Sequence, residues 1–431
     1  MSEKANTRVL FITPQPFLAN RGSPLRVKSE IEALLTLGYE VDVLCFPFGT
    51  EWNRESCGGN GRKNGGVKLL RSWKVPGISE PAVGPSWQKI IMDIPLTMKA
   101  LVLGLSGTNY DVIHGVEEAA FIAQVIGFIR KTPFVSDLHS LLPDQLRYSG
   151  FLSNKYLISG AYKAYNQCLK NSSGIVAVCK EVQDYASLVA PHVPCAQLED
   201  LPLDSSWESS RENENKLRKN YSLEGKTILA YTGNFSSYQG IQLLLESYAL
   251  ALRNLPNSKD QRLLLVGESN PELLQLEQRR ANELGISENV IFTGELPSSM
   301  MGSVMSIADA LVSPRSKGGN TPLKVYCYMA SGKPLVATAI SSHTQALDDK
   351  SAFLAAPDPA SFAQAIIKAL ETNHAARELQ RQKGECARYL LESRFNKKLF
   401  TQAMGWLYER VTQAPLPEEN WEQNFACKIA S

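Results

Sequence analysis

Short apolar runs recur along the chain, and segments with an apolar residue at every third or fourth position separate many of them. Runs that read as buried strands occupy residues 8–12, 40–45, 67–71, 111–114, 133–136 and 174–178 in the first half. In the second half they occupy 227–231, 262–266, 290–293, 310–313, 335–337 and 352–354. Strands that alternate with helices form parallel sheets covered by helices on both faces. The pattern therefore predicts an α/β chain with two doubly wound units.

A polar segment at residues 205–220 separates the two sets of strands, directly after the sequence E-D-L-P-L-D. We therefore expect a first domain at residues 1–204 and a second at 205–395. Residues 397–411 form an amphipathic segment, so that 396–431 are expected to be a terminal helix and tail.

Residues 87–105 read as a mostly apolar helix that contains Lys89 and Lys99. Packing in the core of the first domain is the favoured interpretation. The alternative is a surface for a lipid-linked acceptor. The most apolar part of this segment also contains Asp93 and Pro95, and is too interrupted to span a bilayer.

The stretch from Ser313 to Thr338 reads as strand end, loop, helix, turn and strand. Asn320 and Thr321 are expected to cap a helix whose first residue is Pro322. One apolar face of this helix is expected to carry Leu323, Tyr326, Cys327 and Ala330, and Gly332 is expected to end it in a left-handed conformation. The free amides at the helix start predict an anion seat, with Lys324 in the first turn. The alternative is an ordinary surface lysine on a well-capped helix.

Composition excludes several classes of protein. The chain has 431 residues, 44% of them hydrophobic and 20% charged, as in a soluble globular protein. A net charge of +2 gives no reason to expect nucleic acid as a partner. The 8 cysteines lack metal-ligand spacing and suit a reducing compartment, and the polar first residues do not resemble a signal peptide. The glycine-rich segment 57–66 lacks the spacing of a phosphate-binding loop and is expected to be a surface excursion.

The stretch 313–338 resembles the donor-binding segment of retaining GT-B glycosyltransferases of family 4. The residues that match are Lys324, Tyr328, Met329, Ala330, Gly332, Lys333, Pro334 and Val336. The two glutamate positions of that family fall on Gly319 and Cys327, a departure shared with a branch that carries N-T-P-L-K. The resemblance implies a GT-B architecture, with two Rossmann-like domains facing across a cleft and the last helices crossing back to the first domain.

The resemblance also implies which residues bind the sugar donor. Gly22 would lie close to the donor diphosphate. The segment 233–240 corresponds to the donor loop, with Asn234 and Gln239 in place of its usual basic residues. The full set of expected donor-binding residues is Gly22, Gly233, Asn234, Gln239, Gly240, Gly267, Glu295, Leu296, Arg315, Asn320, Thr321, Pro322, Leu323 and Lys324.

A histidine follows the predicted strand 133–136 and is the candidate catalytic residue. A side chain at the carboxyl end of a strand in an α/β fold is placed for chemistry, and the resemblance puts His139 beside the reacting sugar. The alternative is a loop histidine with a structural role. Asp137, Asp144 and Arg147 lie nearby in the sequence and are expected to hold acceptor hydroxyls.

The resemblance implies transfer of a sugar from a nucleotide diphosphate-sugar, UDP-linked by family frequency, to an acceptor hydroxyl with retention. The acceptor would be a glycan or a lipid-linked molecule in bacterial glycan or glycolipid biosynthesis. No cofactor and no metal are expected, and the location is cytoplasmic, with a peripheral contact at the inner face of the membrane left open. A degenerate, non-catalytic nucleotide-sugar-binding subunit is the alternative, because the usual glutamates and basic donor-loop residues are missing. An epimerase would need acidic groups that are not evident.

Overall fold

The computed structural model describes residues 7–17, 22–51, 67–78, 86–148, 154–202, 208–268 and 270–412. It contains two α/β units. Unit 1 comprises the chain up to Glu199 together with helix α15 (Lys397–Thr412), and unit 2 spans Asp200–Asn396. The expected boundary at 204/205 and the glycine-rich segment 57–66 fall outside the described residues.

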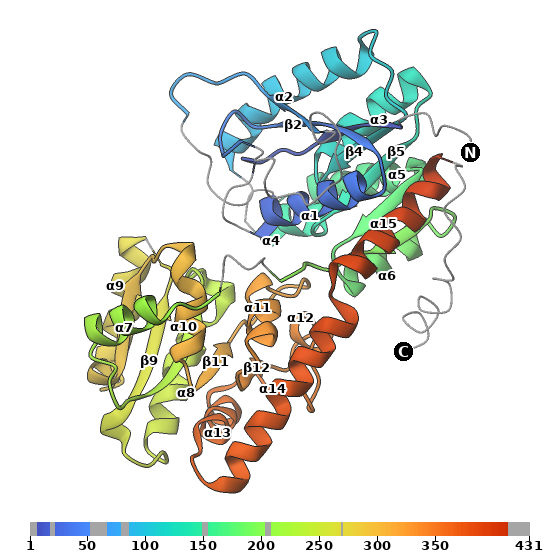
Figure 1. Ribbon diagram of the computed structural model, residues 1–431. Helices are drawn as coiled ribbons and strands as arrows, with labels where there is room; N and C mark the ends of the chain where they lie inside the picture. Colours follow the sequence, from blue (N-terminus) through green and yellow to red (C-terminus); the bar gives the residue numbers. More distant parts are fainter. Residues whose placement is uncertain are drawn as a thin grey trace. The chain divides into compact units, whose positions relative to one another are not determined.

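Unit 1 is built on a parallel sheet of seven strands in the order β3-β2-β1-β4-β5-β6-β7. Of these strands, β2, β4 and β5 are labelled in Figure 1. The strands are β1 (Arg8–Ile12), β2 (Glu40–Cys45), β3 (Val67–Arg71), β4 (Val112–Val116), β5 (Phe134–Leu138), β6 (Gly174–Ala177) and β7 (Cys195–Gln197). The order runs outward from β1 in both directions, so its switch point lies between β1 and β4. Sequence analysis missed β7, in which only the middle residue, Ala196, is fully buried, so that no apolar run marks it. Strands β4 and β5 run two residues further than expected, and Asp137 is therefore part of β5.

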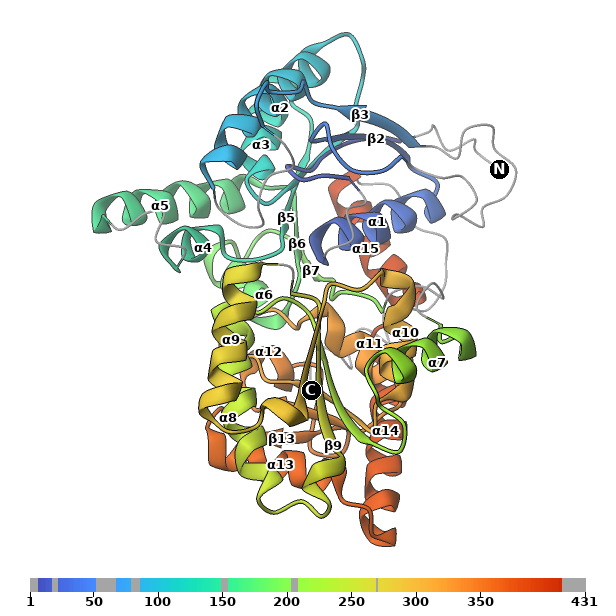
Figure 2. The same ribbon diagram turned by 90° about the vertical axis from the view of Figure 1, so that its left-hand side faces the viewer.

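Helices cover both faces of this sheet. Helix α1 (Gly22–Thr36) and α15 lie on one face, while α2 (Trp87–Leu105), α3 (Ala119–Arg130) and α5 (Lys155–Asn171) lie on the other (Figure 2). The short helix α4 (Leu142–Tyr148) follows β5, and α6 (Lys180–Val189) packs on β6 and β7. Helix α15 packs against α1, β6 and β7. Gly174 gives it room, because a Cβ there would lie 2.7 Å from a Val411 methyl carbon.

Unit 2 contains a parallel sheet of six strands in the order β10-β9-β8-β11-β12-β13. The strands are β8 (Thr227–Thr232), β9 (Gln261–Val266), β10 (Val290–Gly294), β11 (Ala310–Ser313), β12 (Leu335–Thr338) and β13 (Phe353–Ala355). Its helices are α7 (Arg211–Asn220), α8 (Ile241–Leu252), α9 (Pro271–Glu283), α10 (Met301–Ile307), α11 (Leu323–Ser331), α12 (Ser341–Thr344), α13 (Pro359–Leu370) and α14 (His374–Arg394). The switch point lies between β8 and β11. Both units therefore have the predicted doubly wound parallel architecture.

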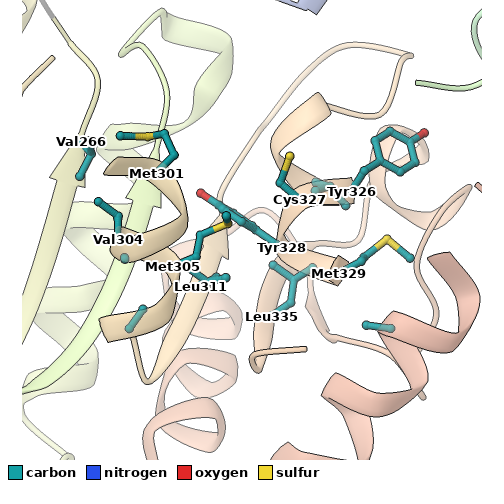
Figure 3. Close-up of a cluster of buried hydrophobic side chains, with 14 of the residues drawn as sticks. Val266, Met301, Val304, Met305, Leu311, Tyr326, Cys327, Tyr328, Met329 and Leu335 are labelled. Carbon is teal, nitrogen blue, oxygen red and sulfur yellow. The ribbon is translucent and has the colours of Figure 1, made fainter. Parts of the chain in front are cut away.

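Helix α11 is packed more deeply than its sequence indicated. Its residues from Val325 to Met329 are all buried, because β11, α10 and α14 surround it (Figure 3). The prediction of a single apolar face was therefore wrong: Leu323 is half-buried and Ala330 is exposed. The predicted end of the helix is confirmed, since Gly332 has a φ of 67° and its amide donates to the carbonyl of Met329.

Cys327 is buried in this cluster (Figure 3). We expect its thiol to react with a thiol reagent only after unfolding, because a buried thiol is an apolar filler. The Cys327→Ser substitution is expected to lower the free energy of unfolding by about 1–3 kcal/mol, because burying a hydroxyl costs more desolvation energy than burying a thiol. Mass spectrometry of pulse-labelled native protein checks the first expectation, with the less buried Cys386 as the internal control. Labelling of Cys327 as fast as Cys386 would contradict it.

Candidate functional site

Two loops of unit 2 meet at its switch point, at the carboxyl ends of β8 and β11. Gly240 has a φ of 77°, and a Cβ added to it would lie 2.0 Å from the carbonyl oxygen of Pro314. Only glycine permits this approach. Gly233, with a φ of 134°, leaves similar room, since its Cβ would lie 2.8 Å from Lys324 Nζ. The predicted donor-loop residues and the start of α11 are therefore brought together.

Lys324 is the cation at the centre of this arrangement. Its Nζ donates to Gln239 Oε1 over 3.2 Å and lies 3.8 Å from the centre of the Tyr231 ring. The side chain is only partly exposed, and no carboxylate among the described residues pairs with it. Burial, and then the charge of Arg315, hold the pKa of Lys324 well below its ordinary value. A partly buried ammonium with no carboxylate partner attracts an anion.

Arg315 shapes the loop that precedes α11. Its guanidinium donates to the carbonyl oxygens of Lys317 and Asn320 and to Asn320 Oδ1, at 2.7, 3.0 and 3.2 Å. It also lies over the ring of Tyr238. These contacts correct the cap predicted for α11. The Asn320 side chain accepts a hydrogen bond from the guanidinium of Arg315. The N-cap residue is Pro322, which makes no side-chain cap bond.

The start of α11 leaves polar groups available. Val325 donates its amide to the carbonyl of Pro322, whereas no backbone bond is seen for the amides of Leu323 and Lys324 within the described residues. Thr321 is buried, and its Oγ1 has no hydrogen-bond partner in the part of the chain that the structure describes. Together with Lys324 these groups form a seat that one or two phosphate oxygens could fill.

Glu268 and His343 are buried polar residues that sequence analysis missed. Glu268 accepts hydrogen bonds from the amides of Phe235 and Asn270, both at 2.6 Å, and so ties the donor loop to the loop after β9. His343 lies 2.8 Å from Ser313 Oγ and 2.9 Å from the carbonyl oxygen of Thr338, beneath the Arg315 loop. The position of Glu268 directly after a strand and a glycine was the available signal. No local signal marked His343.

His343 is expected to make the stability of unit 2 dependent on pH. Burial lowers its pKa from 6.5 to about 4. Below about pH 6.5 the imidazole is protonated in the unfolded chain but stays neutral in the folded chain. The free energy of unfolding is therefore highest above that pH and falls as the pH approaches 4. The loss amounts to at most about 3 kcal/mol. Denaturant unfolding across this range should be less pH-dependent for His343→Asn than for the exposed control His192→Asn. Equal pH dependence in the two variants would contradict the assignment.

The remaining donor-side candidates lie at the same sheet edge of unit 2. Asn234 Oδ1 accepts from the amide of Ser236, and Gly267 donates its amide to the carbonyl of Gly294. Glu295 is exposed, and Leu296 packs against the core. In unit 1, Gly22 is the first residue of α1, and a Cβ added to it would have no described atom within 4 Å.

In unit 1, His139 belongs to a chain of hydrogen bonds. Its Nε2 lies 3.2 Å from Asp137 Oδ2, and Nε2 of His114 lies 3.3 Å from the same oxygen. The Tyr408 hydroxyl, on α15, lies 2.8 Å from His114 Nδ1. Burial acts to raise the pKa of Asp137, but the two histidines and Arg26 hold it well below its ordinary value. An ionised Asp137 therefore receives an N–H from each histidine.

This arrangement sets which ring nitrogen of His139 is available. With its proton on Nε2, the ring presents Nδ1 as an acceptor. That atom is buried and has no partner among the described residues. The structure also corrects the role predicted for Asp137, which is fully buried and contacts the histidines, where an acceptor hydroxyl had been expected.

Two further charged residues lie behind His139. Glu30 Oε1 is 3.9 Å from His139 Nε2 and 2.9 Å from Nε of Arg26, one turn earlier on α1. Glu30, His114 and Asp137 are close enough together to hold a metal ion. Their polar atoms already face Arg26, His139 and Tyr408, an arrangement suited to a hydrogen-bonded network.

Glu117 is a carboxylate that sequence analysis overlooked at the end of β4. Its φ of 52° is unusual for a residue with a side chain, and burial raises its pKa to about 7. The Ser140 hydroxyl donates to it. Strained backbone and a raised pKa together are features of functional positions. Of the predicted acceptor-side residues, Asp144 accepts from the Tyr162 hydroxyl at 2.6 Å and Arg147 is exposed.

Each of the two units matches a family model of glycosyltransferases. The family model described as "Glycosyltransferase Family 4" matches residues 22–191, and the one described as "Glycosyl transferases group 1" matches residues 226–372. The curated protein "Putative glycosyltransferase YtcC" of Bacillus subtilis is 26% identical over 203 residues. That match covers 45% of this chain and 48% of the relative, so the chain spans about half the length of the curated relative it matches.

Solved structures match over nearly the whole chain. Sucrose-phosphate synthase from Thermosynechococcus elongatus has a TM-score of 0.72 at 19% identity, covering 95% of this chain and all of the other. Anabaena Alr3699/HepE, solved in complex with UDP, has a TM-score of 0.67 at 15% identity, covering 94% of this chain and all of the other. These similarities establish the fold. The chain is therefore a GT-B protein that resembles glycosyltransferase family 4 in both of its units.

Proposed function

We propose that this protein transfers a sugar from a nucleotide diphosphate-sugar to an acceptor hydroxyl, with retention of the anomeric configuration. The observation that carries the proposal is the seat at the start of α11. There, the partly buried Lys324 lacks a carboxylate partner and Thr321 Oγ1 lacks a hydrogen-bond partner among the described residues. A diphosphate would supply the negative charge and the acceptor atoms that these groups lack. The family resemblance supports the same ligand.

Unit 2 would stabilise the leaving group. Negative charge develops on the nucleoside diphosphate as the bond to the sugar breaks, and Lys324 with the free amides of α11 would stabilise that charge electrostatically. These groups can do so without a metal ion. His139 in unit 1 would accept a hydrogen bond from a sugar hydroxyl through Nδ1 and position it.

The donor and acceptor follow from similarity to other proteins. UDP is the expected nucleotide, in line with family frequency and with the UDP complex of the Anabaena protein. A glycan or lipid-linked acceptor in a bacterial cytoplasm, reached at the inner face of the membrane, completes the proposal. The alternative is a subunit that binds a nucleotide-sugar without turnover, since Gly319 and Cys327 replace the usual glutamates.

Two measurements test this proposal. Thermal shift with UDP, GDP and ADP identifies the nucleotide, and at least one is expected to stabilise the protein. A panel of nucleotide-sugars, with and without candidate acceptors, is then scored for released nucleotide. Release that depends on an acceptor supports transfer. Binding without release from any donor would favour the non-catalytic subunit, and the absence of binding would refute both.

A further inference from the structure

The outer side of helix α2 is apolar along its whole length. Eight of its residues are exposed: Trp87, Gln88, Ile90, Ile91, Ile94, Met98, Val102 and Leu105. All but Gln88 have large apolar side chains, and Trp87 is 72% and Val102 62% exposed. A separate row on the inner side, Met92, Leu96, Ala100 and Gly104, is buried. Core packing, the interpretation that the sequence favoured, therefore accounts for only one side of this helix.

Helix α3 continues the apolar surface. Its exposed residues are Val125, Phe128 and Ile129, and Phe128 is 86% exposed. Helices α2 and α3 lie side by side in Figures 1 and 2. Contact is close, because a Cβ on Gly104 would lie 2.7 Å from Ile126. We call the exposed residues of these two helices the α2–α3 face. An apolar surface of this extent on a soluble protein marks a site of interaction.

The charged side chains of α2 are turned away from this face. Lys89 pairs with Glu118, Lys99 donates to the carbonyl of Arg71, and Asp93 has a buried oxygen. Exposed lysines occur in the segments next to the face: Lys74 next to the exposed Trp73, Lys131 after α3, and Lys155, Lys163 and Lys170 on α5. The exposed acid in the segment after α2, Asp111, accepts from the amide of Arg8. Helix α5 contacts α3 and contains no acidic residue.

We propose that the α2–α3 face docks on the surface of a lipid bilayer that contains anionic lipids. Apolar side chains would enter the boundary of the acyl chains, tryptophans would lie among the headgroups, and the lysines would meet anionic phosphates. Among the described helices, none is long and apolar enough to cross a bilayer, so this contact lies on the surface.

A second copy of the chain fits the face less well. A twofold interface would bring the lysines of one rim close to those of the other, and like charges oppose such an approach. A bilayer supplies the opposite charge. Docking on a bilayer does not require the proposed sugar transfer. It rests on that function only for its purpose, which would be to meet a lipid-linked acceptor at this surface.

Sedimentation of the full chain with lipid vesicles tests the proposal. Vesicles of phosphatidylcholine with about one third phosphatidylglycerol are compared with vesicles of phosphatidylcholine alone, at low and high salt. The variant Ile94→Gln/Met98→Gln/Phe128→Gln alters only exposed side chains and should melt like the wild type. The matched control, Leu276→Gln/Leu379→Gln/Tyr389→Gln, alters exposed apolar residues of unit 2.

The wild type and the control are expected to bind the anionic vesicles, and to bind them more weakly at high salt. The α2–α3 variant is expected to bind them at least about tenfold more weakly than the wild type. Equal binding of both variants, or no binding of the wild type, would overturn the proposal. So would a lipid-free dimer, seen by light scattering, that the α2–α3 substitutions dissociate. Nucleotide titration of the same samples tests the proposed function separately, because vesicle binding needs no turnover.

Discussion

Replacing Lys324 by alanine is expected to weaken binding of a nucleoside diphosphate by about ten- to a hundred-fold. A charge-assisted hydrogen bond from a lysine to phosphate contributes about 1.5–3 kcal/mol. Lys324→Met, which keeps an apolar side chain over Tyr231, should weaken binding to the same degree, because both variants lack the positive charge of the ammonium group. Calorimetric titration at fixed salt measures the effect.

Two neighbours of Lys324 serve as controls. Asn234→Ala and Gln239→Ala are expected to change the affinity only a few-fold, since Asn234 contacts Ser236 and Gln239 carries no charge. If Gln239→Ala weakens binding more than Lys324→Ala, the phosphate site belongs to the loop after β8.

Binding should also change the protonation of Lys324. Burial and Arg315 lower the pKa of Lys324 in the free protein, and a bound diphosphate would raise it again. At a pH between the lowered pKa of Lys324 and its ordinary value, the titration is therefore expected to take up protons. The apparent enthalpy would then depend on the ionisation enthalpy of the buffer, and Lys324→Met should remove much of that dependence. An unchanged buffer dependence in the variant would place the titrating group elsewhere.

Replacing His139 by alanine is expected to lower turnover by about 100- to 10,000-fold and to leave nucleotide affinity nearly unchanged. The affected step is positioning of a sugar hydroxyl by Nδ1, whereas the phosphates are expected to bind in unit 2. Turnover and affinity are measured on the same preparation. Wild-type turnover in the variant would exclude a role for His139.

The hydrogen bonds behind His139 provide a second test that needs no substrate. In Asp137→Asn the side-chain amide can donate a hydrogen bond to His139 Nε2, which favours the tautomer with its proton on Nδ1. Nδ1 would then be a hydrogen-bond donor instead of an acceptor. Nitrogen-15 NMR of labelled histidines is expected to show Nε2 protonated in the wild type and Nδ1 protonated in the variant. Tyr408→Phe, which removes only the bond to His114, is expected to leave the His139 tautomer unchanged. An Nδ1-protonated His139 in the wild type would refute the assignment.

Local patterns in the sequence determined much of the fold. Apolar runs and helical spacing located the strands of both sheets except β7, and the end of α11 at Gly332, because the period of buried residues and the chemistry of a turn act over a few neighbouring positions. The residues placed at strand ends, His139 and Gly233 among them, could be named for the same reason. The start of α11 could not, because Arg315 takes the Asn320 side chain that would otherwise have been free to cap it.

Tertiary structure alone decided which side chains meet. Tyr408 and His114 are 294 positions apart in the sequence, and their contact exists only because α15 packs on the sheet of unit 1. Lys324 and Gln239, 85 positions apart, are joined where two loops cross at a switch point. Both the buried and the exposed row of α2 are apolar, so hydrophobicity could not show which one the sheet would cover. Packing buried the row that contains Leu96 and left the row that contains Ile94 exposed, because α2 can lay only one side against the sheet and α3.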